Sequence, residues 1–236
     1  MPTDRRETTS VLVRCGDDAL LLDAGTGARR LVTDPALVEG VARLDVVLTH
    51  FHLDHVCGLA YLPAIGIVST VWAPGRWLYR RSSAELLAPL RESPISPFSL
   101  AELGEIAELE PGRQQIGRFT VLARAQLNHW APTAGLRVGD ELALITDTGY
   151  DPEGIPFARG VSELLHEAWS DAAAPRAPEY DATGRDAALV AAGAAARRLT
   201  LIHLNPLISD HATILADARA IRADADLGRD RQTLRL

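Results

Sequence analysis

Short apolar runs alternate with polar turns and with longer stretches of helical periodicity along most of the chain. Two runs near the start, 10–16 and 19–25, flank the turn residues Gly16-Asp17-Asp18 and predict a pair of strands. Strands are also predicted at 45–50, 70–74, 118–129, 136–140, 141–147 and 199–203. The apolar run at 161–171 is compatible with a strand or with the end of a helix.

Helices are predicted where apolar positions recur at helical spacing. A short one is expected at 35–44, with Asp34 as N-cap and Pro35 in the first turn. The clearest covers 184–198, and other helical pieces are predicted at 56–66, 82–91, 99–106 and 210–223. The pattern shows no internal repeat, and residues 170–186 are the loosest stretch.

Composition narrows the class of protein. The 236 residues, 47% hydrophobic and 23% charged, predict one sizeable α/β domain over residues 1–236. A net charge of −7 excludes a global basic field that would attract nucleic acid. The start of the chain lacks the apolar region of a signal peptide, and no run reaches membrane-spanning length. A cytoplasmic protein without a membrane partner is therefore expected.

Four of the apolar runs end in a residue that can bind a metal ion. The run at 45–50 ends in His50, the run at 121–129 in His129, the run at 142–147 in Asp147 and the run at 199–203 in His203. Functional sites of strand-rich α/β proteins gather where strands end and loops begin. The pattern therefore predicts that these side chains serve one site.

The stretch "LTHFHLDHVCGL" at 48–59 strengthens this prediction. It places His50, His52, Asp54 and His55 within six positions of a chain that has seven histidines. Neutral imidazole is the commonest metal ligand, and a neighbouring carboxylate suits a divalent cation. As a plain polar loop, the cluster would be desolvated without partners. We interpret it as part of a metal site.

These motifs together resemble the metallo-β-lactamase superfamily over roughly residues 8–236. The His-x-His-x-Asp-His pattern is followed in order by His129, Asp147 and His203, and "LLLDAGTG" upstream contains Asp23. The resemblance implies an αββα sandwich of two mixed β-sheets with outer helices. It also implies two metal ions, with Asp147 bridging them. The implied ligands are His50, His52 and His129 for the first ion, and Asp54, His55 and His203 for the second.

Two further motifs indicate the ribonuclease Z and cyclic phosphodiesterase branch. Where lactamase-like members have Pro-Gly-His-Thr, this chain has "NHWAPTAGLRV", and "LLHEAW" resembles the branch's His-Glu-Ala-Thr motif and includes Glu167. The chain departs from the branch at 182–185, where "ATGR" replaces a His-Ser-Thr element. Only about 18 residues separate His129 from Asp147, which leaves no room for a tRNA-clamping arm. A small phosphodiester substrate is therefore expected.

The resemblance also implies a mechanism. Two divalent ions, Zn²⁺ by expectation with Mn²⁺ or Fe²⁺ as alternatives, would share a hydroxide that attacks the substrate. Asp54 would orient this hydroxide as well as bind metal. The expected activity is hydrolysis of a small or cyclic phosphodiester, with thioester or lactone hydrolysis as the alternative and non-catalytic metal binding as a third hypothesis. The expected partner is a small-molecule substrate, nucleic acid is not expected, and a homodimer is left open.

The branch's usual catalytic histidine is absent, so another group has to protonate the leaving group. His211 is one candidate, and its alternative is a surface position at a helix start capped by Asp210. Glu167 is expected to contact the site from its surroundings, while His166 is expected to be structural.

Three other features have open interpretations. Asp23 is expected to support a ligand loop. Cys57 is a small buried apolar residue or, as an alternative, a ligand. The segment "VWAPGRWLYRR", 71–81, is either a solvated helical segment or a substrate lid whose aromatic and guanidinium groups hold a ring and a phosphate.

Overall fold

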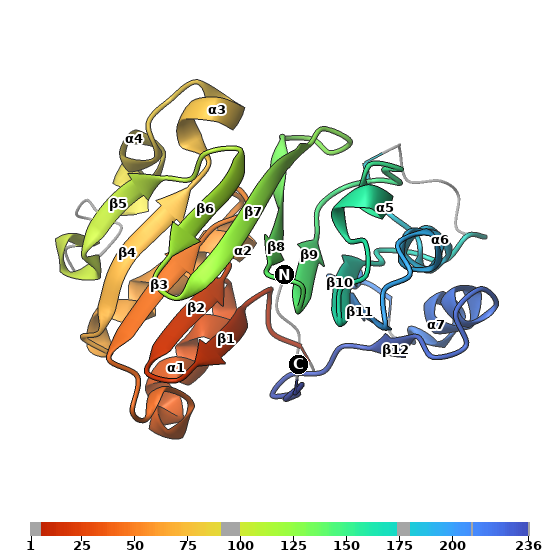
Figure 1. Ribbon diagram of the computed structural model, residues 1–236, viewed down its shortest axis with the longest axis horizontal. Coiled ribbons are helices and arrows are strands. Elements are labelled where there is room, and N and C mark those ends of the chain that lie inside the picture. Colours follow the sequence, from red (N-terminus) through yellow and green to blue (C-terminus); the bar gives the residue numbers. More distant parts are fainter. Residues whose placement is uncertain (1–5, 91–99, 174–179, 209, 236) are drawn as a thin grey trace. The chain divides into compact units, whose positions relative to one another are not determined.

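The computed structural model describes residues 6–90, 100–173, 180–208 and 210–235 (Figure 1). The chain divides into two compact units, Met1–Thr120 and Val121–Leu236. Each unit is described by itself, and the prediction of one domain over 1–236 stays a prediction. Within the described ranges, every helix is too short or too polar to cross a membrane.

The first unit contains a five-stranded mixed sheet with the order β1-β2-β3-β4-β5. Strands β1 and β2 are antiparallel, while β2, β3, β4 and β5 run parallel to one another. The strands are β1 Val11–Cys15, β2 Asp18–Leu22, β3 Arg43–Val47, β4 Val68–Ala73 and β5 Glu105–Glu108.

The helices of the first unit are all short. The α-helices are α1 Arg30–Thr33, α2 Leu53–Val56, α3 Gly75–Tyr79 and α4 Ser83–Leu87. The 3-10 helices are η1 Thr26–Arg29, η2 Pro35–Val38, η3 Cys57–Ala64, η4 Ala88–Leu90 and η5 Leu100–Leu103.

The second sheet has seven strands in the order β12-β11-β10-β9-β8-β7-β6 and is also mixed. Strands β7, β8 and β9 are antiparallel neighbours, while β9, β10, β11 and β12 are parallel. The boundary between the units falls within β7. The strands are β6 Gly112–Ile116, β7 Phe119–Gln126, β8 Thr133–Val138, β9 Leu142–Ile145, β10 Glu163–Glu167, β11 Arg198–Ile202 and β12 Asp226–Leu227. The helices of the second unit are α5 Gly154–Phe157, α6 Gly184–Gly193 and α7 Ala212–Arg219.

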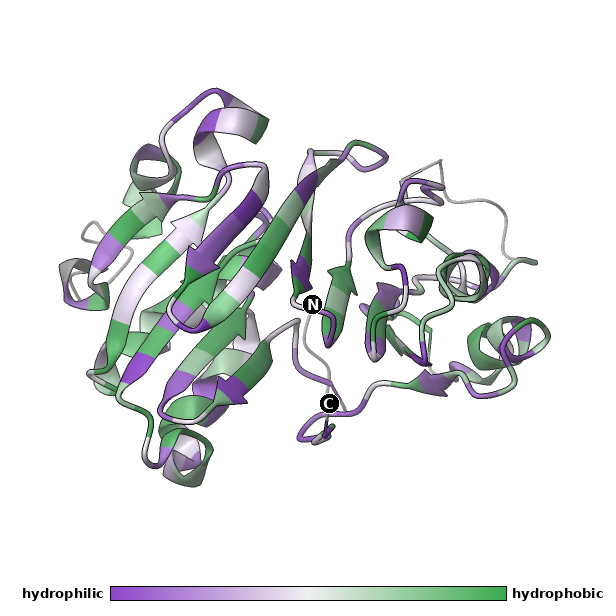
Figure 2. Ribbon diagram, viewed as in Figure 1, coloured by the Kyte–Doolittle hydropathy of each residue, from purple (hydrophilic) through white to green (hydrophobic). Residues whose placement is uncertain are grey.

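Each unit has its own hydrophobic core. In the first unit, leucines and valines of β2 and β3 pack with η3, and in the second unit β9, β10 and β11 pack with the alanine-rich face of α6. Figure 2 shows the hydrophobic colours along β2 and β9. Strands β2, β3, β9 and β10 are buried on both faces. This explains why they stand out in the sequence as nearly continuous apolar runs.

The strand pair at the start of the chain and all six other predicted strand regions are present, and 161–171 contains strand β10. Three helix predictions are wrong at their C-terminal ends. The helix predicted at 35–44 stops at Val38, because Gly40 has a φ of +73° and Arg43 begins strand β3 beside β2. The Asp34 side chain makes no capping hydrogen bond there.

The other two errors have the same physical cause, because strand pairing replaced helical continuation. In the predicted stretch 99–106, η5 ends before Gly104, whose φ is +77°, and Glu105 begins β5 alongside β4. In 184–198, α6 ends at Gly193, and Arg198 begins β11. Residues 91 and 99, at the edges of two predicted helices, lie outside the described residues.

Parallel pairing brings the predicted site residues to one edge of each sheet. In the first unit, Asp23 follows β2 and the His50 stretch follows β3, so both lie at the carboxyl edge of parallel strands. In the second unit, Asp147, Glu167 and His203 lie at the ends of the parallel strands β9, β10 and β11.

A close approach of two backbone segments fixes the Asp23 loop beside α2. The amide of Ala24 donates to the carbonyl of His55 at 2.8 Å, and the amide of Gly58 donates to the carbonyl of Ala24 at 2.7 Å. A Cβ atom at position 58 would overlap the carbonyl oxygen of Gly25. Glycine at position 58 is therefore needed for this contact.

We expect Gly58→Ala to lower the free energy of unfolding by about 1–3 kcal/mol or more, since the added methyl must push two backbone segments apart. Urea unfolding at pH 7 measures this change. Ala60→Ser, at an exposed position of the same 3-10 helix, is the control and should have little effect. Equal stability of Gly58→Ala and the parent protein would contradict the proposed crowding.

Candidate metal centre

The first unit brings the four residues of the His-x-His-x-Asp-His motif together. His50 comes three residues after β3, His52 precedes α2, and Asp54 and His55 belong to that helix. The imidazole ring centroid of His50 lies 4.4 Å from that of His52 and 4.3 Å from that of His55. Three imidazoles packed at this distance repel one another when protonated, so the arrangement favours neutral rings that can bind a cation.

Asp23 is fully buried and holds this group in place. It has a φ of 57°, and such strained positions are concentrated at functional sites. Its carboxylate accepts hydrogen bonds from the backbone amide of Thr49 at 2.7 Å and from Nδ1 of His55 at 2.8 Å. Because a carboxylate can only accept, His55 carries its proton on Nδ1 and turns its Nε2 lone pair outward. The expected supporting role of Asp23 agrees with these contacts.

Thr49 fixes the tautomer of His50, as Asp23 fixes that of His55. The sequence analysis missed this role of Thr49. The Thr49 hydroxyl lies 2.9 Å from Oδ2 of Asp23 and 2.9 Å from Nδ1 of His50. The Thr49 hydroxyl has one proton and donates it in a hydrogen bond to Asp23. Its oxygen therefore accepts a hydrogen bond from Nδ1–H of His50. The Nε2 atom of His50 is thereby left deprotonated, as a metal ligand requires.

Asp54 and Cys57 differ in their suitability as ligands. One Asp54 carboxylate oxygen lies 3.7 Å from Nε2 of His55, a separation beyond a hydrogen bond and compatible with two ligands of one cation. The thiol of Cys57 is half-buried, and burial together with the charge of Asp54 raises its pKa. Among the described residues, no group of three or more potential ligand atoms within 4.8 Å of one another includes the thiol, which favours the apolar interpretation of Cys57.

In the second unit, Asp147 lies between two imidazoles. Its Oδ1 is 3.6 Å from Nε2 of His129, and its Oδ2 is 3.6 Å from Nε2 of His203. Two ligands on one tetrahedral Zn²⁺, with bonds of about 2.0–2.1 Å, are separated by about 3.3 Å. Both separations are therefore compatible with two ligands of one cation. Asp147 and His203 have φ values of 52° and 47°, so both ligand positions are strained.

The two histidines are oriented by their surroundings. Nδ1 of His129 donates to the carbonyl of Tyr180 at 3.0 Å, which leaves Nε2 facing Asp147. The ring of His203 stacks on Trp169 with 5.4 Å between centroids and 29° between planes. The sequence patterns did not indicate the Tyr180 carbonyl, because a backbone group has no residue-type signal.

Glu167 lies at the end of β10 and is fully buried. Its Oε2 accepts from the amide of Thr148 at 2.9 Å, while Oε1 has no hydrogen-bond partner among the described residues. Potential ligand atoms of Asp147, Glu167 and His203 all lie within 4.8 Å of one another. A buried carboxylate oxygen without a donor is costly unless a cation or a proton satisfies it, so the site fits a metal ion.

Electrostatics within the second unit support this interpretation. Burial, followed by the charges of Asp147 and Asp181, raises the pKa of Glu167 well above its usual range. Asp181, which the sequence analysis missed, is half-buried and lies 3.8 Å from Nδ1 of His129. Burial raises its pKa as well, and the charge of Asp147 adds to this effect while His129 and His203 oppose it. Three carboxyl groups that destabilise one another's ionised forms create a strong preference for a bound cation.

The two histidines outside the proposed ligand set, His166 and His211, lie in different environments. His166 is buried, its Nδ1 donates to the carbonyl of Glu167 at 2.7 Å, and burial lowers its pKa to about 4. These contacts agree with the structural role expected for His166. His211 occupies the N-cap position of α7, and its Nε2 donates to the carbonyl of Asn205 at 3.1 Å. Asp210 accepts from the amide of Ala212 at 2.9 Å, as expected for a residue at a helix start.

The segment 71–81 forms the end of β4 and helix α3. The ring of Tyr79 packs edge-on against Phe51, the residue between His50 and His52, at 5.2 Å, and exposed Arg76 pairs with Glu108 at 3.7 Å. This arrangement leaves both interpretations open, a solvated helix and a substrate lid.

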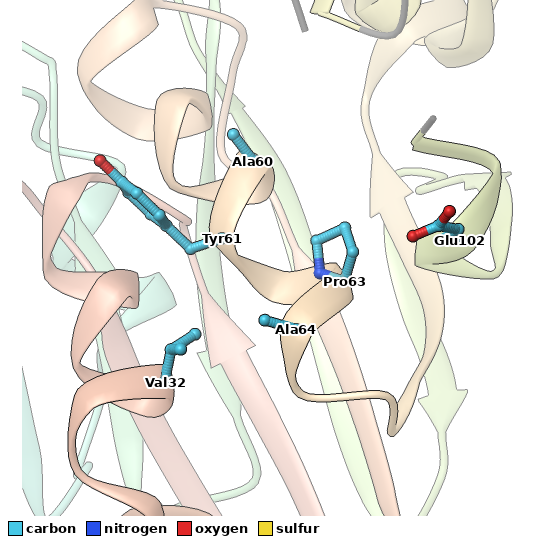
Figure 3. Close-up of a pocket in the computed structure, with 6 residues that line it drawn as sticks. All are labelled: Val32, Ala60, Tyr61, Pro63, Ala64 and Glu102. Carbon is cyan, nitrogen blue, oxygen red and sulfur yellow. The ribbon is translucent and has the colours of Figure 1, made fainter. Parts of the chain in front are cut away.

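The first unit also contains a hollow of about 230 Å³ (Figure 3). Its lining is mainly apolar, comes from α1, η3 and η5, and includes none of the predicted ligands: Val32, Ala60, Tyr61, Pro63, Ala64 and Glu102. We do not assign the chemistry to this hollow, because it offers a single carboxylate and no imidazole.

The chain belongs to the family described as the beta-lactamase superfamily domain, whose model matches residues 18–204. With its two mixed sheets and helices, it has the metallo-β-lactamase fold, and the predicted superfamily and its ribonuclease Z-like branch are confirmed. The protein is accordingly a metal-dependent hydrolase of this superfamily. The fold implies divalent metal ions.

Relatives by sequence include the ribonuclease Z of Nocardia farcinica, 28% identical over 87% of this chain and 84% of that protein. An uncharacterized Mycobacterium tuberculosis protein, Rv1339, is 29% identical over 85% of this chain and 75% of its own length. Among solved structures, the metallo-β-lactamase fold protein YhfI from Bacillus subtilis matches with a TM-score of 0.78 and 19% identity, covering 97% of this chain and 92% of that one. A diphosphatase from the PhnP family matches with a TM-score of 0.73 and 19% identity, covering 100% and 87%.

We expect Asp23→Asn to weaken metal binding roughly 10–100-fold, because an amide cannot accept all the hydrogen bonds that orient His50 and His55. Competition with a chromophoric chelator measures the affinity, and circular dichroism checks the fold. Asp45→Asn is the matched control, since Asp45 is buried in the same unit and pairs with Arg43. The assigned role of Asp23 is wrong if both variants lose affinity equally.

Proposed function

We propose that the protein binds two divalent cations, Zn²⁺ by expectation, and hydrolyses a small phosphodiester. The observation that carries the proposal is the placement of the two Asp147 oxygens, each 3.6 Å from Nε2 of a different histidine. The proposed ligands are those of the sequence analysis: His50, His52, Asp54, His55, His129, Asp147 and His203.

Two divalent cations, when bound, lower the pKa of water towards about 7 and neutralise charge on the phosphate in the transition state. The chain's own residues prepare for this chemistry. Asp23, Thr49 and the carbonyl of Tyr180 hold Nδ1–H of three histidines and leave each Nε2 deprotonated. The half-exposed carboxylate of Asp54 is proposed to orient the attacking water in addition to binding metal. The water oxygen forms a new P–O bond and loses a proton, one ester P–O bond breaks, and the leaving oxygen takes up a proton.

The phosphodiester class is supported by the named relatives. Several curated relatives are ribonuclease Z proteins, and one structural neighbour is a diphosphatase. Ribonuclease Z cleaves an RNA chain by its name, so these relatives do not exclude a nucleic-acid substrate. We favour a small substrate because β8 begins seven residues after Gln126, so that a short loop carries His129 and no inserted arm separates it from Asp147.

Asp147→Ala should lose at least one metal ion per chain and nearly all hydrolysis, because each of its oxygens faces a different proposed ligand. Metal content is measured by elemental analysis after reconstitution, and activity with bis(p-nitrophenyl) phosphate. Asp151→Asn is the matched control, a carboxylate of the same unit that pairs with Arg124 at 2.6 Å. Parental metal content and rate in Asp147→Ala would rule out the bridging role.

The same assay decides the substrate class. For the parent protein, kcat/KM with bis(p-nitrophenyl) phosphate should exceed kcat/KM with acyl thioesters and lactones. Acyl substrates cleaved orders of magnitude faster would establish the alternative, an acyl hydrolase of the same superfamily. Bound metal without hydrolysis of any of these substrates would favour the non-catalytic hypothesis.

His211 is our proposed proton donor to the leaving group. Its Nε2 is engaged with Asn205, and no hydrogen bond ties Nδ1 to the part of the chain that the structure describes. General acid catalysis by a side chain contributes roughly 10²–10⁴-fold. We expect His211→Ala to lower kcat at least about tenfold for a diester with an alkoxide leaving group, with a much smaller effect for p-nitrophenolate, which departs without a proton.

Metal content of His211→Ala should equal that of the parent protein. Equal small effects on both substrates would show that His211 is only a surface residue at the start of α7. Loss of metal would instead show that it supports the metal site, and Glu167 or Asp181 would then need to be tested as the proton source.

A further inference from the structure

Trp130 is exposed to an unusual degree for such a large apolar side chain. It directly follows the proposed metal ligand His129, and 73% of its surface is exposed. Isolated apolar residues at a protein surface need no explanation, but a grouped set does.

The exposed apolar side chains of the second unit are concentrated on the ligand loops. Among its described residues, Leu127, Trp130, Tyr150 and Leu207 are 71%, 73%, 42% and 90% exposed, and the other large one, Leu189, lies on α6. The first four follow β7, β9 and β11, the strands whose ends carry His129, Asp147 and His203. Such a distribution is expected if these side chains contact a substrate.

Trp130 is held in a defined position. Its ring lies 4.6 Å from the ring of Tyr180 at an angle of 39°, and the Tyr180 carbonyl accepts the proton of Nδ1 of His129. The loop is also tied down by the amide of Gly149, which donates to the carbonyl of Asn128 at 2.7 Å. The aromatic pair is thus fixed to the same residue that is proposed to bind metal, which reduces the entropy lost when a ligand binds.

We propose that Trp130 and Tyr180 form a stacking platform for the nucleobase of the substrate. This inference rests on the proposed phosphodiesterase function and narrows its substrate to nucleoside phosphodiesters. Phosphodiesters of nucleosides carry a planar ring, the nucleobase, and every base offers a π-face to an aromatic side chain. The platform adjoins His129, so a base stacked there belongs to the same molecule as the phosphate at the metal ions.

The test compares two diesters with the same leaving group. The p-nitrophenyl ester of thymidine 5′-phosphate carries a base, whereas methyl p-nitrophenyl phosphate does not. Stacking contributes about 1–3 kcal/mol per base, which corresponds to roughly 5- to 150-fold in affinity. We expect Trp130→Ala to raise KM for the thymidine ester at least about fivefold, with little change in kcat, and to leave the methyl ester unaffected.

Two further variants complete the comparison. Trp130→Phe keeps a ring and should restore most of the affinity, while Leu189→Ala removes an exposed apolar side chain from α6 and should change neither substrate. Calorimetric binding of thymidine 5′-phosphate and methyl phosphate to the metal-loaded protein provides a second measurement that does not depend on hydrolysis. Trp130→Ala should weaken only the binding of the thymidine compound.

The outcomes separate the two proposals. If the parent protein cleaves neither diester, the proposed function fails, and the binding comparison still decides whether the platform recognises a base. Equal losses for both compounds in Trp130→Ala would overturn the platform and assign Trp130 to the support of His129. Loss of a dimer in Trp130→Ala, with unchanged preference for the thymidine compounds, would also overturn it and identify a contact with a second copy of the chain.

Discussion

The buried carboxylate of Asp23 is the group on which the motif of the first unit depends. A buried charge without partners would be strongly destabilising, and Asp23 avoids this by accepting from Thr49 and His55. Those same hydrogen bonds decide which nitrogen of His55 is protonated and, through the Thr49 hydroxyl, which nitrogen of His50. The hydrogen bonds that satisfy Asp23 therefore also fix the tautomers of His50 and His55, two of the proposed ligands.

The buried carboxyl groups of the second unit are in a different electrostatic environment from that of Asp23. Burial and the charge of Asp147 raise the pKa of Glu167 and of Asp181, although the Thr148 amide donates to Glu167 and the Thr146 hydroxyl donates to Asp147. The structure places the imidazoles of His129 and His203 beside Asp147, and it leaves Oε1 of Glu167 without a donor in the described chain. An arrangement that is electrostatically unfavourable without a cation binds a cation strongly, because the cation relieves the repulsion.

The surroundings of His129 connect the proposed metal site to the proposed stacking platform. The Tyr180 carbonyl orients His129, and the Tyr180 ring packs against Trp130. A change at Tyr180 would therefore affect both the proposed ligand and the proposed platform. The stretch near 181–185, where the branch has a His-Ser-Thr element, supplies Asp181 here, so this chain places a carboxyl group rather than an imidazole beside the ligands.

The sequence alone determined most of the strands and the identity of the proposed ligands, because buried parallel strands are continuous apolar runs and ligand chemistry requires His and Asp at their ends. It misplaced the ends of helices at 35–44, 99–106 and 184–198, since pairing with neighbouring strands overrides local helical preference. Only the tertiary structure showed the Thr49 hydroxyl and the Tyr180 carbonyl as partners of His50 and His129. Common hydroxyls and backbone groups acquire such roles only through contacts between segments distant in sequence, and residue type does not encode them.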